Sequence, residues 1–289
     1  MINMPHNFYV ADILTPLTDA GKYVVRNGVD FFKGALDLVY KFLGDNPTST
    51  DSKSTFYNAW KVVSNLYDDF AIIGYSLVVL FFLYGFLRDS IDIRKDLQFE
   101  SIIKLFIRFT LTINVMNLFM TYVPRFCSWA IDLLGVTKNK YKVSFNKDTV
   151  NTIANQIGKQ YDAATILVGI IIWLVCVVCA VIVIYSCFGR FINFYLLVPF
   201  GSVGLSTLAG GGQLSQTGFN YIKSLLVYTF EIVAMGVVLA IAGAFLSGSV
   251  IVDQKSGGGW LMFELIVKII TVTAALKGAD STIRKAFGM

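Results

Sequence analysis

Residues 163–189 form the longest apolar run in the chain, AATILVGIIIWLVCVVCAVIVIYSCFG. As an α-helix, this run of 27 residues would extend about 40 Å, whereas the hydrocarbon core of a bilayer is roughly 30 Å thick. The run is therefore long enough to cross a membrane with some tilt. A chain that carries such a run is expected to fold within a bilayer rather than as a water-soluble globular domain.

Composition places the whole chain in the same class. The mean hydropathy is +0.65, with 55% hydrophobic and 15% charged residues, which is too apolar for an ordinary soluble domain. The first six residues contain neither a basic region nor an early apolar run, so we expect no cleaved secretory signal. The formal net charge of +5 is expected from basic loop residues that orient the spans, so it does not by itself indicate an anionic partner.

The sequence carries little that is typical of a catalytic or metal site. Cys176 and Cys179 form a C-x-x-C pair, but they lie inside the longest apolar run, and the one histidine is His6. We interpret them as small buried hydrophobes rather than metal or redox ligands, and we expect no cofactor. The sequence has no His-Glu-x-x-His motif and no pair of intramembrane aspartates, so we predict that the chain is not an enzyme.

The hydropathy pattern predicts an all-α membrane protein with about five transmembrane helices. The expected spans are residues 70–87, 109–123, 163–189, 221–247 and 260–279. Amphipathic helices in residues 1–66 would form an extracytoplasmic or interfacial region, and residues 67–289 would form a polytopic transmembrane domain.

The N-terminal region is predicted to be amphipathic. Residues 15–44 are typical of one helix, with Thr15 as its N-cap and Gly44 at its end. Its apolar residues recur at spacings of three and four along one stripe: Val25, Val29, Phe32, Leu36, Val39 and Leu43. The stripe could lie in the membrane interface, pack on the next helix, or meet the same helix of a neighbouring subunit. A second helix is expected to run directly into the first span, with one side formed by Phe56, Trp60, Val63, Tyr67 and Phe70.

Polar residues share one face of the second span. They recur at spacings of three and four: Thr110, Asn114, Asn117, Thr121 and Arg125. Because a side-chain amide facing lipid is costly, this face should meet protein or water. Two interpretations remain, namely polar packing between helices and the lining of a wet cavity.

The chain from residue 190 to residue 220 stays rather apolar but cannot form one continuous helix. Its helix-breaking residues are Pro199, Gly201, Gly204 and the triplet Gly210, Gly211 and Gly212. We predict a short half-helix, a bend at Val198–Pro199 and a glycine-rich loop between spans three and four. Such backbone is stable at membrane depth only where protein or a watery cavity covers it. The triplet lacks the lysine and hydroxyl residue of a nucleotide-binding loop, so we interpret it as a hinge.

Two charged residues are expected at similar depth in spans four and five. Glu231 and Lys268 lie on successive antiparallel spans, and Glu264 precedes Lys268 by one turn. We predict that Glu231 and Lys268 pair, with Glu264 as a second carboxylate. The pair could fix the helix register, relay a proton or ion, or form a subunit contact.

A stripe of small residues is predicted to mediate close helix packing in span four. It consists of Gly236, Ala240, Ala244 and Gly248, one at every fourth position.

Basic residues are distributed unevenly between the short links. Arg88, Arg94, Lys95, Lys104 and Arg108 crowd the link between spans one and two, whereas the link between spans four and five holds only Lys255. Positive charge in short loops marks the cytoplasmic side. We therefore predict a multi-pass protein of the inner (cytoplasmic) membrane, with the N-terminus outside and the C-terminus in the cytoplasm.

The succession from Arg190 to Lys223 resembles the core of the TrbL-like inner-membrane proteins of type IV secretion and conjugation machines. The residues that carry the resemblance are Arg190, Tyr195, Pro199, Leu208, Ala209, Gly210, Gly211, Gly212, Gly218, Phe219, Asn220, Tyr221, Ile222 and Lys223. The similarity is concentrated in about 30 to 60 residues, and the layout of an exposed N-terminus and five spans agrees with it.

The resemblance implies a platform subunit present in several copies, which helps to form the membrane passage for DNA or protein cargo. It also implies a secretion ATPase on the cytoplasmic side and stalk components outside as partners, besides the membrane lipids. The main alternative is a small secondary transporter, for which paired broken helices in two repeats would be expected, while only one break is visible. A multi-span assembly scaffold is a further alternative.

Overall fold

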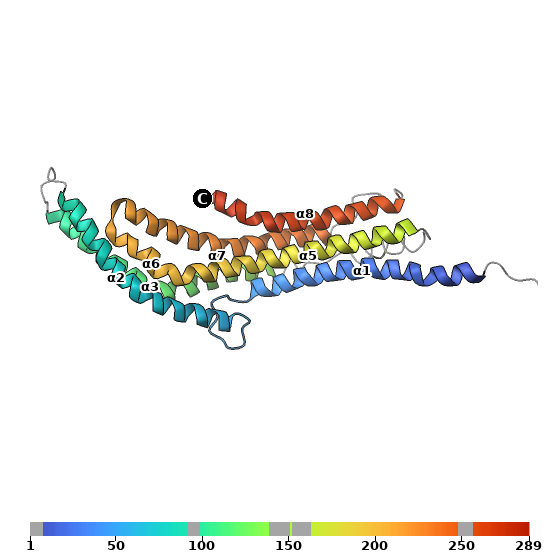
Figure 1. Ribbon diagram of the computed structural model, residues 1–289, viewed down its shortest axis with the longest axis horizontal. Helices are drawn as coiled ribbons and strands as arrows, with labels where there is room; N and C mark the ends of the chain where they lie inside the picture. Colours follow the sequence, from blue (N-terminus) through green and yellow to red (C-terminus); the bar gives the residue numbers. More distant parts are fainter. Residues whose placement is uncertain (1–7, 92–98, 139–150, 152–162, 248–256, 289) are drawn as a thin grey trace, which may run out of the picture. The chain divides into compact units, whose positions relative to one another are not determined.

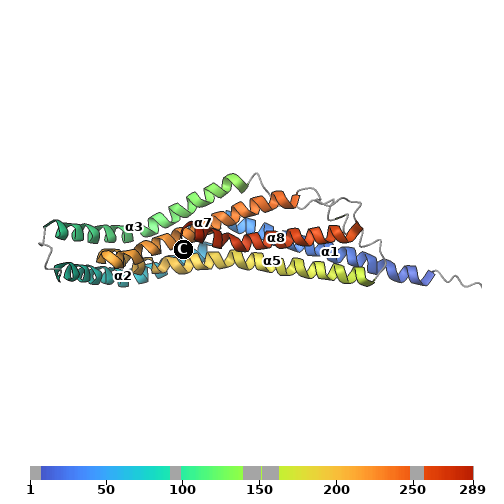
Figure 2. The same cartoon turned by 90° about the horizontal axis from the view of Figure 1, so that it is seen from above.

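The computed structural model describes residues 8–91, 99–138, 151, 163–247 and 257–288. All regular structure within these residues is helical, which confirms the all-α class (Figures 1 and 2). The helices are α1 (Phe8–Gly44), α2 (Tyr57–Ile91), α3 (Phe99–Lys138), α5 (Ala163–Leu197), η1 (Val198–Phe200), α6 (Gly201–Ser206), η2 (Thr207–Gly210), α7 (Gly212–Ser247) and α8 (Gly257–Ala286).

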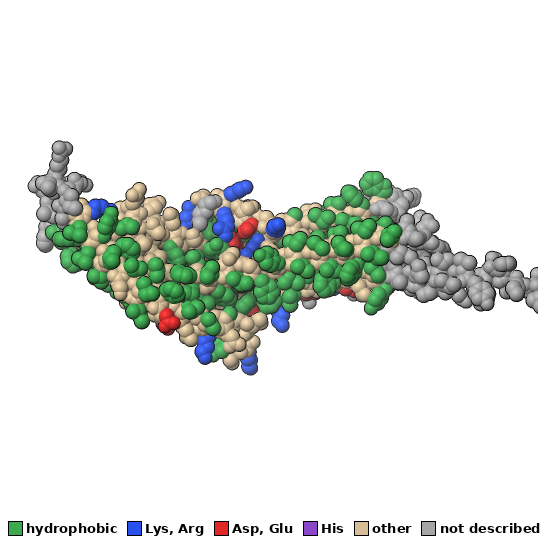
Figure 3. All heavy atoms as spheres, viewed as in Figure 1, with side chains coloured by type: hydrophobic (Ala, Val, Ile, Leu, Met, Phe, Trp, Pro, Cys, Tyr) green, Lys and Arg blue, Asp and Glu red, His purple; other side chains and the backbone are tan. Residues whose placement is uncertain are grey.

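Within the described residues, four helical stretches are long and apolar enough to cross a membrane. They are Tyr57–Arg88, Ile102–Leu133, Leu167–Gly210 and Gly212–Leu246. Their exposed side chains are largely hydrophobic, and Figure 3 shows such side chains over much of the visible face. The fifth predicted span coincides with part of α8, which is not among these four stretches, so its crossing of the membrane stays a prediction.

Contacts divide the chain into two compact units. Unit 1 comprises Met1–Lys41, Val136–Cys187 and Met235–Ala279, and unit 2 comprises Phe42–Gly135, Phe188–Ala234 and Asp280–Met289. The borders fall within α1, α3, α5, α7 and α8, whereas the sequence pattern placed a domain boundary at residue 66.

Unit 1 contains most of α1 and buries its apolar stripe. Five stripe residues of this unit are buried, namely Val25, Val29, Phe32, Leu36 and Val39, while Arg26, Asp30 and Asp37 on the other side are exposed. A Cβ atom at Gly28 would lie 3.0 Å from Trp173 Cα, so the two helices are in direct contact there. Helix α5 therefore lies against α1 at Gly28.

Helix α1 is longer than predicted. It begins at Phe8 rather than at Thr15, so Thr15 is not its N-cap and Pro16 lies inside it. A proline inside a helix removes one backbone hydrogen bond, but the helix can continue when the hydrogen bonds of its other turns remain. The predicted end at Gly44 is confirmed.

The part of α5 in unit 1 has one buried and one exposed apolar face. Ile172, Cys176 and Val183 are buried, while Ile171, Leu174 and Tyr185 are exposed. A helix that is apolar on all sides is suited to contact protein on one face and acyl chains on the other. Cys176 and Cys179 are both buried, in agreement with their interpretation as packing residues.

In unit 2, α2 runs without interruption from the amphipathic segment into the first span, as predicted. Its residues Trp60, Val63 and Tyr67 are buried in a cluster with Phe119 of α3 and Phe194 of α5. The Tyr67 and Phe119 rings stack at a centroid distance of 5.4 Å. Tyr67 also donates a hydrogen bond of 2.8 Å to Met116 O, which holds α2 to α3.

Two glycines let α2 pack closely on η1, α6 and η2 (Figure 1). A Cβ atom at Gly74 would lie 2.6 Å from Ser202 Cβ, and one at Gly85 would lie 2.8 Å from Gly210 O. Because atoms cannot approach so closely, each position requires glycine for this packing. Helix α2 thereby covers one side of the broken segment.

Candidate functional site

The predicted break lies between α5 and α7. Helix α5 continues past Arg190 to Leu197, so the half-helix predicted after Arg190 is the end of α5 itself. The bend begins at η1, with Pro199 in its first turn, and α6 and η2 follow directly. The backbone φ angles of Gly211 and Gly212 are +64° and +54°, a conformation that glycine adopts without strain. The glycine triplet thus forms the turn into α7.

Tyr221 compensates for the change of helix type at the bend. The Gly201 N–H donates to Val198 O, three residues earlier, and the Tyr221 hydroxyl donates to Leu197 O at 3.0 Å. The Tyr221 ring lies so close to Gly204 that a Cβ atom there would be 2.6 Å from it. Carbonyl groups at membrane depth need such donors, because acyl chains supply none.

The broken segment is buried within unit 2. Pro199, Ser202, Ser206 and Ala209 are all buried. The start of α7 returns along the segment, and a Cβ atom at Gly218 would lie 2.6 Å from Leu208 side-chain atoms (Figure 1). Protein therefore covers this backbone, as its helix-breaking residues led us to expect.

Other residues that carry the family resemblance also make contacts in unit 2. The Tyr195 hydroxyl donates to Pro47 O at 2.7 Å, and Arg190 Nη1 donates to Glu231 O at 3.4 Å. The Arg190 side chain is 5% exposed. Lys223 Nζ donates to Gly288 O at 3.4 Å. These contacts join α5 and α7, the helices on either side of the broken segment, to backbone that is distant in the sequence.

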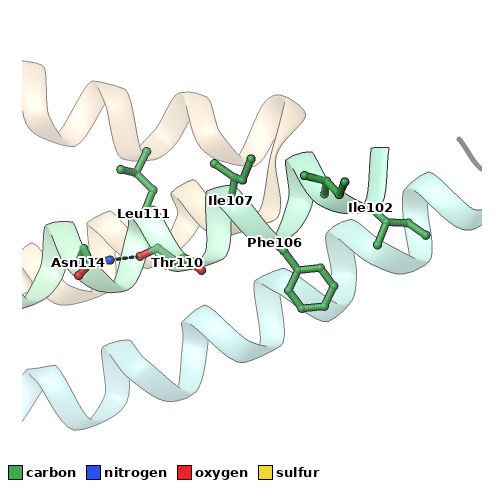
Figure 4. A pocket seen from close by; sticks show the side chains of 7 residues that line it. Ile102, Phe106, Ile107, Thr110, Leu111 and Asn114 are labelled. Atoms are coloured by element: carbon green, nitrogen blue, oxygen red, sulfur yellow. Dashed lines mark hydrogen bonds between the residues drawn. The ribbon is translucent and has the colours of Figure 1, made fainter. Parts of the chain in front are cut away.

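The predicted polar face of the second span is confirmed as one face of α3, and it is exposed. All five side chains, Thr110, Asn114, Asn117, Thr121 and Arg125, are exposed in a single copy of the chain. Asn114 Nδ2 donates to Thr110 O at 2.9 Å (Figure 4), and the Tyr75 hydroxyl of α2 donates to Asn117 Oδ1. Helices of the same unit therefore do not enclose this face.

A cavity of about 380 Å³ borders the polar face. It lies between α3, α6 and α7, and its lining includes Asn114, Phe119, Leu205 and Leu225. The lining is almost entirely apolar, which suits a hydrocarbon chain or a neighbouring helix better than a polar solute. Sequence patterns did not predict this cavity. The periodicity of one helix shows which of its residues share a face, but it does not show where gaps remain between that helix and its neighbours.

Glu231 has a partner that the sequence patterns did not identify. Its Oε1 atom lies 3.1 Å from Arg284 Nε, and the Glu231 residue is 1% exposed. The partner predicted from the sequence was Lys268, which belongs to unit 1, so that pairing stays a prediction. The fifth span was predicted to end at Ala279, with Arg284 as a flanking residue, whereas α8 continues to Ala286.

Arg284 is further held by Tyr228. The guanidinium carbon lies 4.9 Å from the centre of the Tyr228 ring. A hydrogen bond with Tyr228 raises the pKa of Arg284 above its usual range, and Glu231 adds to the effect. Arg284 is thus a permanent cation beside a buried carboxylate. The Phe230 and Phe287 rings, 5.6 Å apart, pack the C-terminal residues on α7 in the same unit.

Lys268 pairs within its own helix in unit 1. Its Nζ atom lies 2.8 Å from Glu264 Oε1, so the predicted role of Glu264 as a carboxylate for Lys268 is confirmed. Lys268 is 7% exposed, and its Nζ atom also lies 5.9 Å from the centre of the Phe245 ring. This pair neutralises a buried cation on an apolar helix.

The small-residue stripe of α7 is only partly buried. Gly236 and Ala240 are buried, whereas Ala244 is exposed. Gly248 lies outside the described residues. Close packing is therefore supported for the first two positions.

Together, these observations define a helical multi-pass membrane protein with a broken, protein-covered segment and an exposed polar face. No protein-family model matches the chain, no curated protein matches its sequence, and no solved structure matches it.

Proposed function

We propose that the chain is a membrane-spanning platform subunit of a type IV secretion machine, and that it oligomerises to help form the passage for DNA or protein cargo. The observation that carries the proposal is the polar face of α3, which is exposed within an apolar stretch long enough to cross a membrane. Amide and guanidinium groups exposed to acyl chains are costly. A second subunit or a water-filled passage would remove this cost.

The broken segment supports the same proposal. Its sequence carries the resemblance to the TrbL-like proteins, and its buried backbone fits a fixed structural element rather than a loose loop. A rigid element of this kind is suited to a platform on which other subunits assemble. The partners would be a cytoplasmic secretion ATPase and extracytoplasmic stalk components.

The proposal includes a place and an orientation. The chain would lie in the inner membrane with its N-terminus outside and its C-terminus in the cytoplasm, because the link after α2 carries the densest positive charge. The fifth span, residues 260–279, would bring the C-terminal residues to the cytoplasmic side.

The mass of the gently extracted protein tests the proposal. We expect a homo-oligomer that copurifies with a secretion ATPase, and we expect Asn114→Leu combined with Asn117→Leu to lower the oligomer fraction. Removing the amides makes the face compatible with lipid, so one reason for association is lost. The matched control is Asn65→Leu, which removes an exposed amide from α2 and should leave the oligomer fraction unchanged.

The results of this experiment separate the candidate functions. An unchanged oligomer in the double variant would show that the polar face does not carry the association. A stable monomer, whose unfolding temperature rises with a small solute, would favour the secondary transporter. The cavity beside α3 would then be the first place to look for its substrate.

A further inference from the structure

Helix α1 carries a row of charged side chains on the side opposite its buried stripe. This charged face consists of residues that follow one another at spacings of three and four and alternate in sign: Arg26, Asp30, Lys33, Asp37 and Lys41. Lys33 is half-buried and the other four are exposed. Within the described residues, none of these five side chains forms an ion pair. One copy of the chain therefore leaves the charges to their surroundings.

The charged face lies at the level of the longest apolar run. A Cβ atom at Gly28 would lie 3.0 Å from Trp173 Cα, and both residues belong to unit 1. Trp173 is at least about 15 Å from either end of the run 163–189. Arg26 and Asp30 are each two residues from Gly28, so their Cα atoms lie within about 3 Å of the same level. In both views, α1 runs beside this part of α5 (Figures 1 and 2).

The other helices of unit 1 expose apolar side chains. Helix α5 exposes Ile171 and Leu174, α7 exposes Ile241, and α8 exposes Phe263 and Ile270. Such faces are suited to acyl chains, whereas exposed charges at membrane depth are costly in lipid. Unit 1 therefore needs lipid beside its apolar helices and a polar environment beside α1.

A neighbouring copy of the chain is a poor cover for the charged face. The outer faces of α5, α7 and α8 offer mainly apolar side chains, which would strip the charges of water without pairing them. A second α1 is no better, because copies related by an axis along the membrane normal keep each residue at the same height. Asp30 would then lie level with Asp30 of the neighbour, and Arg26 with Arg26. Water remains as the medium that hydrates both signs of charge.

We propose that the charged face of α1 borders a water-filled passage, while the outer face of α5 meets lipid at the same depth. The inference rests on the proposed oligomer, because a copy with lipid on its other sides cannot enclose water alone. The passage would accept hydrated, polar cargo. Since its lining carries both signs of charge, it would hold neither acidic nor basic cargo tightly.

Spin labels on the full chain in liposomes test this proposal. The variants are Arg26→Cys, Asp30→Cys, Ile171→Cys and Leu174→Cys, each of which alters an exposed side chain. The first two lie beside Gly28 and the last two beside Trp173, so the pairs are matched in depth. Collisions of each label with a water-soluble nickel chelate and with molecular oxygen, which concentrates in hydrocarbon, are measured. The unaltered protein controls for labelling of the native cysteines, which are buried.

We expect the nickel chelate to collide with labels at positions 26 and 30 at least about tenfold more often than with labels at positions 171 and 174. The reason is that a polar solute enters hydrocarbon only at a large cost in free energy. Oxygen should show the reverse order. Two labels on each face keep the comparison valid if one variant does not fold.

Three results would overturn the proposal. Frequent oxygen but rare chelate collisions at positions 26 and 30 would place the charged face in lipid, and protection from both probes would place it against protein. Frequent chelate collisions at positions 171 and 174 would place unit 1 in water. The mass of the same samples separates this proposal from the proposed function. An oligomer with any of these patterns removes only the passage beside α1, whereas a monomer removes the proposed function as well.

Discussion

The ion pair of Glu231 and Arg284 illustrates how a buried charge is stabilised in this chain. Glu231 lies on an apolar helix and is almost fully buried, so its carboxylate has lost most of its hydration. The Arg284 guanidinium approaches to 3.1 Å and is itself held by Tyr228. Breaking a buried pair leaves one charge uncompensated, which costs more than the pair contributes. The contact therefore fixes the C-terminal residues on α7.

A double-mutant cycle measures this contact. We expect Glu231→Gln and Arg284→Gln each to lower the free energy of unfolding by about 1–3 kcal/mol, and the double variant to lose less than the sum by at least about 0.5 kcal/mol. The measurement is the SDS dependence of unfolding in mixed micelles. A second cycle with Glu231→Gln and Lys268→Met tests the pairing that the sequence predicts. Coupling in this second cycle but not in the Arg284 cycle would assign Lys268, rather than Arg284, as the partner of Glu231.

Tyr221 illustrates how a single hydroxyl group can stabilise a helix break. We expect Tyr221→Phe to lower the free energy of unfolding by about 0.6–2 kcal/mol, because Leu197 O then loses the donor that the hydroxyl provides. Tyr185→Phe is the matched control, since Tyr185 is 77% exposed and its loss should change stability by less than about 0.5 kcal/mol. Equal effects of the two changes in thermal unfolding would show that the Leu197 contact is not stabilising.

At the scale of elements, α2 and the broken segment depend on each other. The segment from η1 to η2 makes short helical turns whose backbone must be kept from acyl chains, and α2 covers it along Gly74 and Gly85. Helix α3, with 40 residues, extends about 60 Å and so exceeds the hydrocarbon core. Only part of its length therefore needs to be lipid-compatible, and its polar face must be covered within that part.

Two glycine-to-alanine changes separate packing from helix propensity. Gly74→Ala should lower the free energy of unfolding by about 1–3 kcal/mol, because the new methyl group would overlap Ser202 backbone and side-chain atoms. Gly189→Ala should raise it by about 0.5–1 kcal/mol, because no other described residue beyond the adjoining helix backbone comes within 4 Å of the new methyl group, and alanine favours the helix. SDS-induced unfolding of both variants checks the prediction. A stabilising Gly74→Ala would mean that α2 does not approach α6 this closely.

At the scale of the whole molecule, the chain is a set of long helices with abundant exposed apolar surface. In water such surface would drive aggregation, whereas in a bilayer it meets acyl chains at little cost. The exposed amides on α3 lie within such an apolar stretch, and they point to a neighbour that one copy of the chain does not supply. The proposed oligomer would cover this face of α3.

Cysteine labelling checks the proposed orientation. The four native cysteines are buried, so they should react slowly with a membrane-impermeant maleimide. We expect Ser52→Cys to be labelled in intact spheroplasts, and Ser281→Cys only after the membrane is opened, since Ser52 precedes the first span and Ser281 follows the last predicted one. Labelling of Ser281→Cys in intact spheroplasts would contradict a cytoplasmic C-terminus.

Local sequence patterns predicted much of the helical structure. Apolar spacing identified the buried stripe of α1 and the buried side of α2, and Pro199 with the glycine triplet located the break. These features depend on neighbours along one helix, so periodicity and proline or glycine chemistry are enough to find them. The helix starts were predicted less well, as Phe8 shows, because a helix end depends on competing local contacts.

The sequence by itself determined the membrane class, because apolar runs of sufficient length have one stable environment. Which residues meet across helices was decided only by the tertiary structure: Arg284 beside Glu231, Gly74 against Ser202, and Tyr221 against Leu197. Such contacts depend on the rotation and offset of each helix against its neighbours. These are set by the sum of many small packing energies, and no single segment of the sequence encodes them.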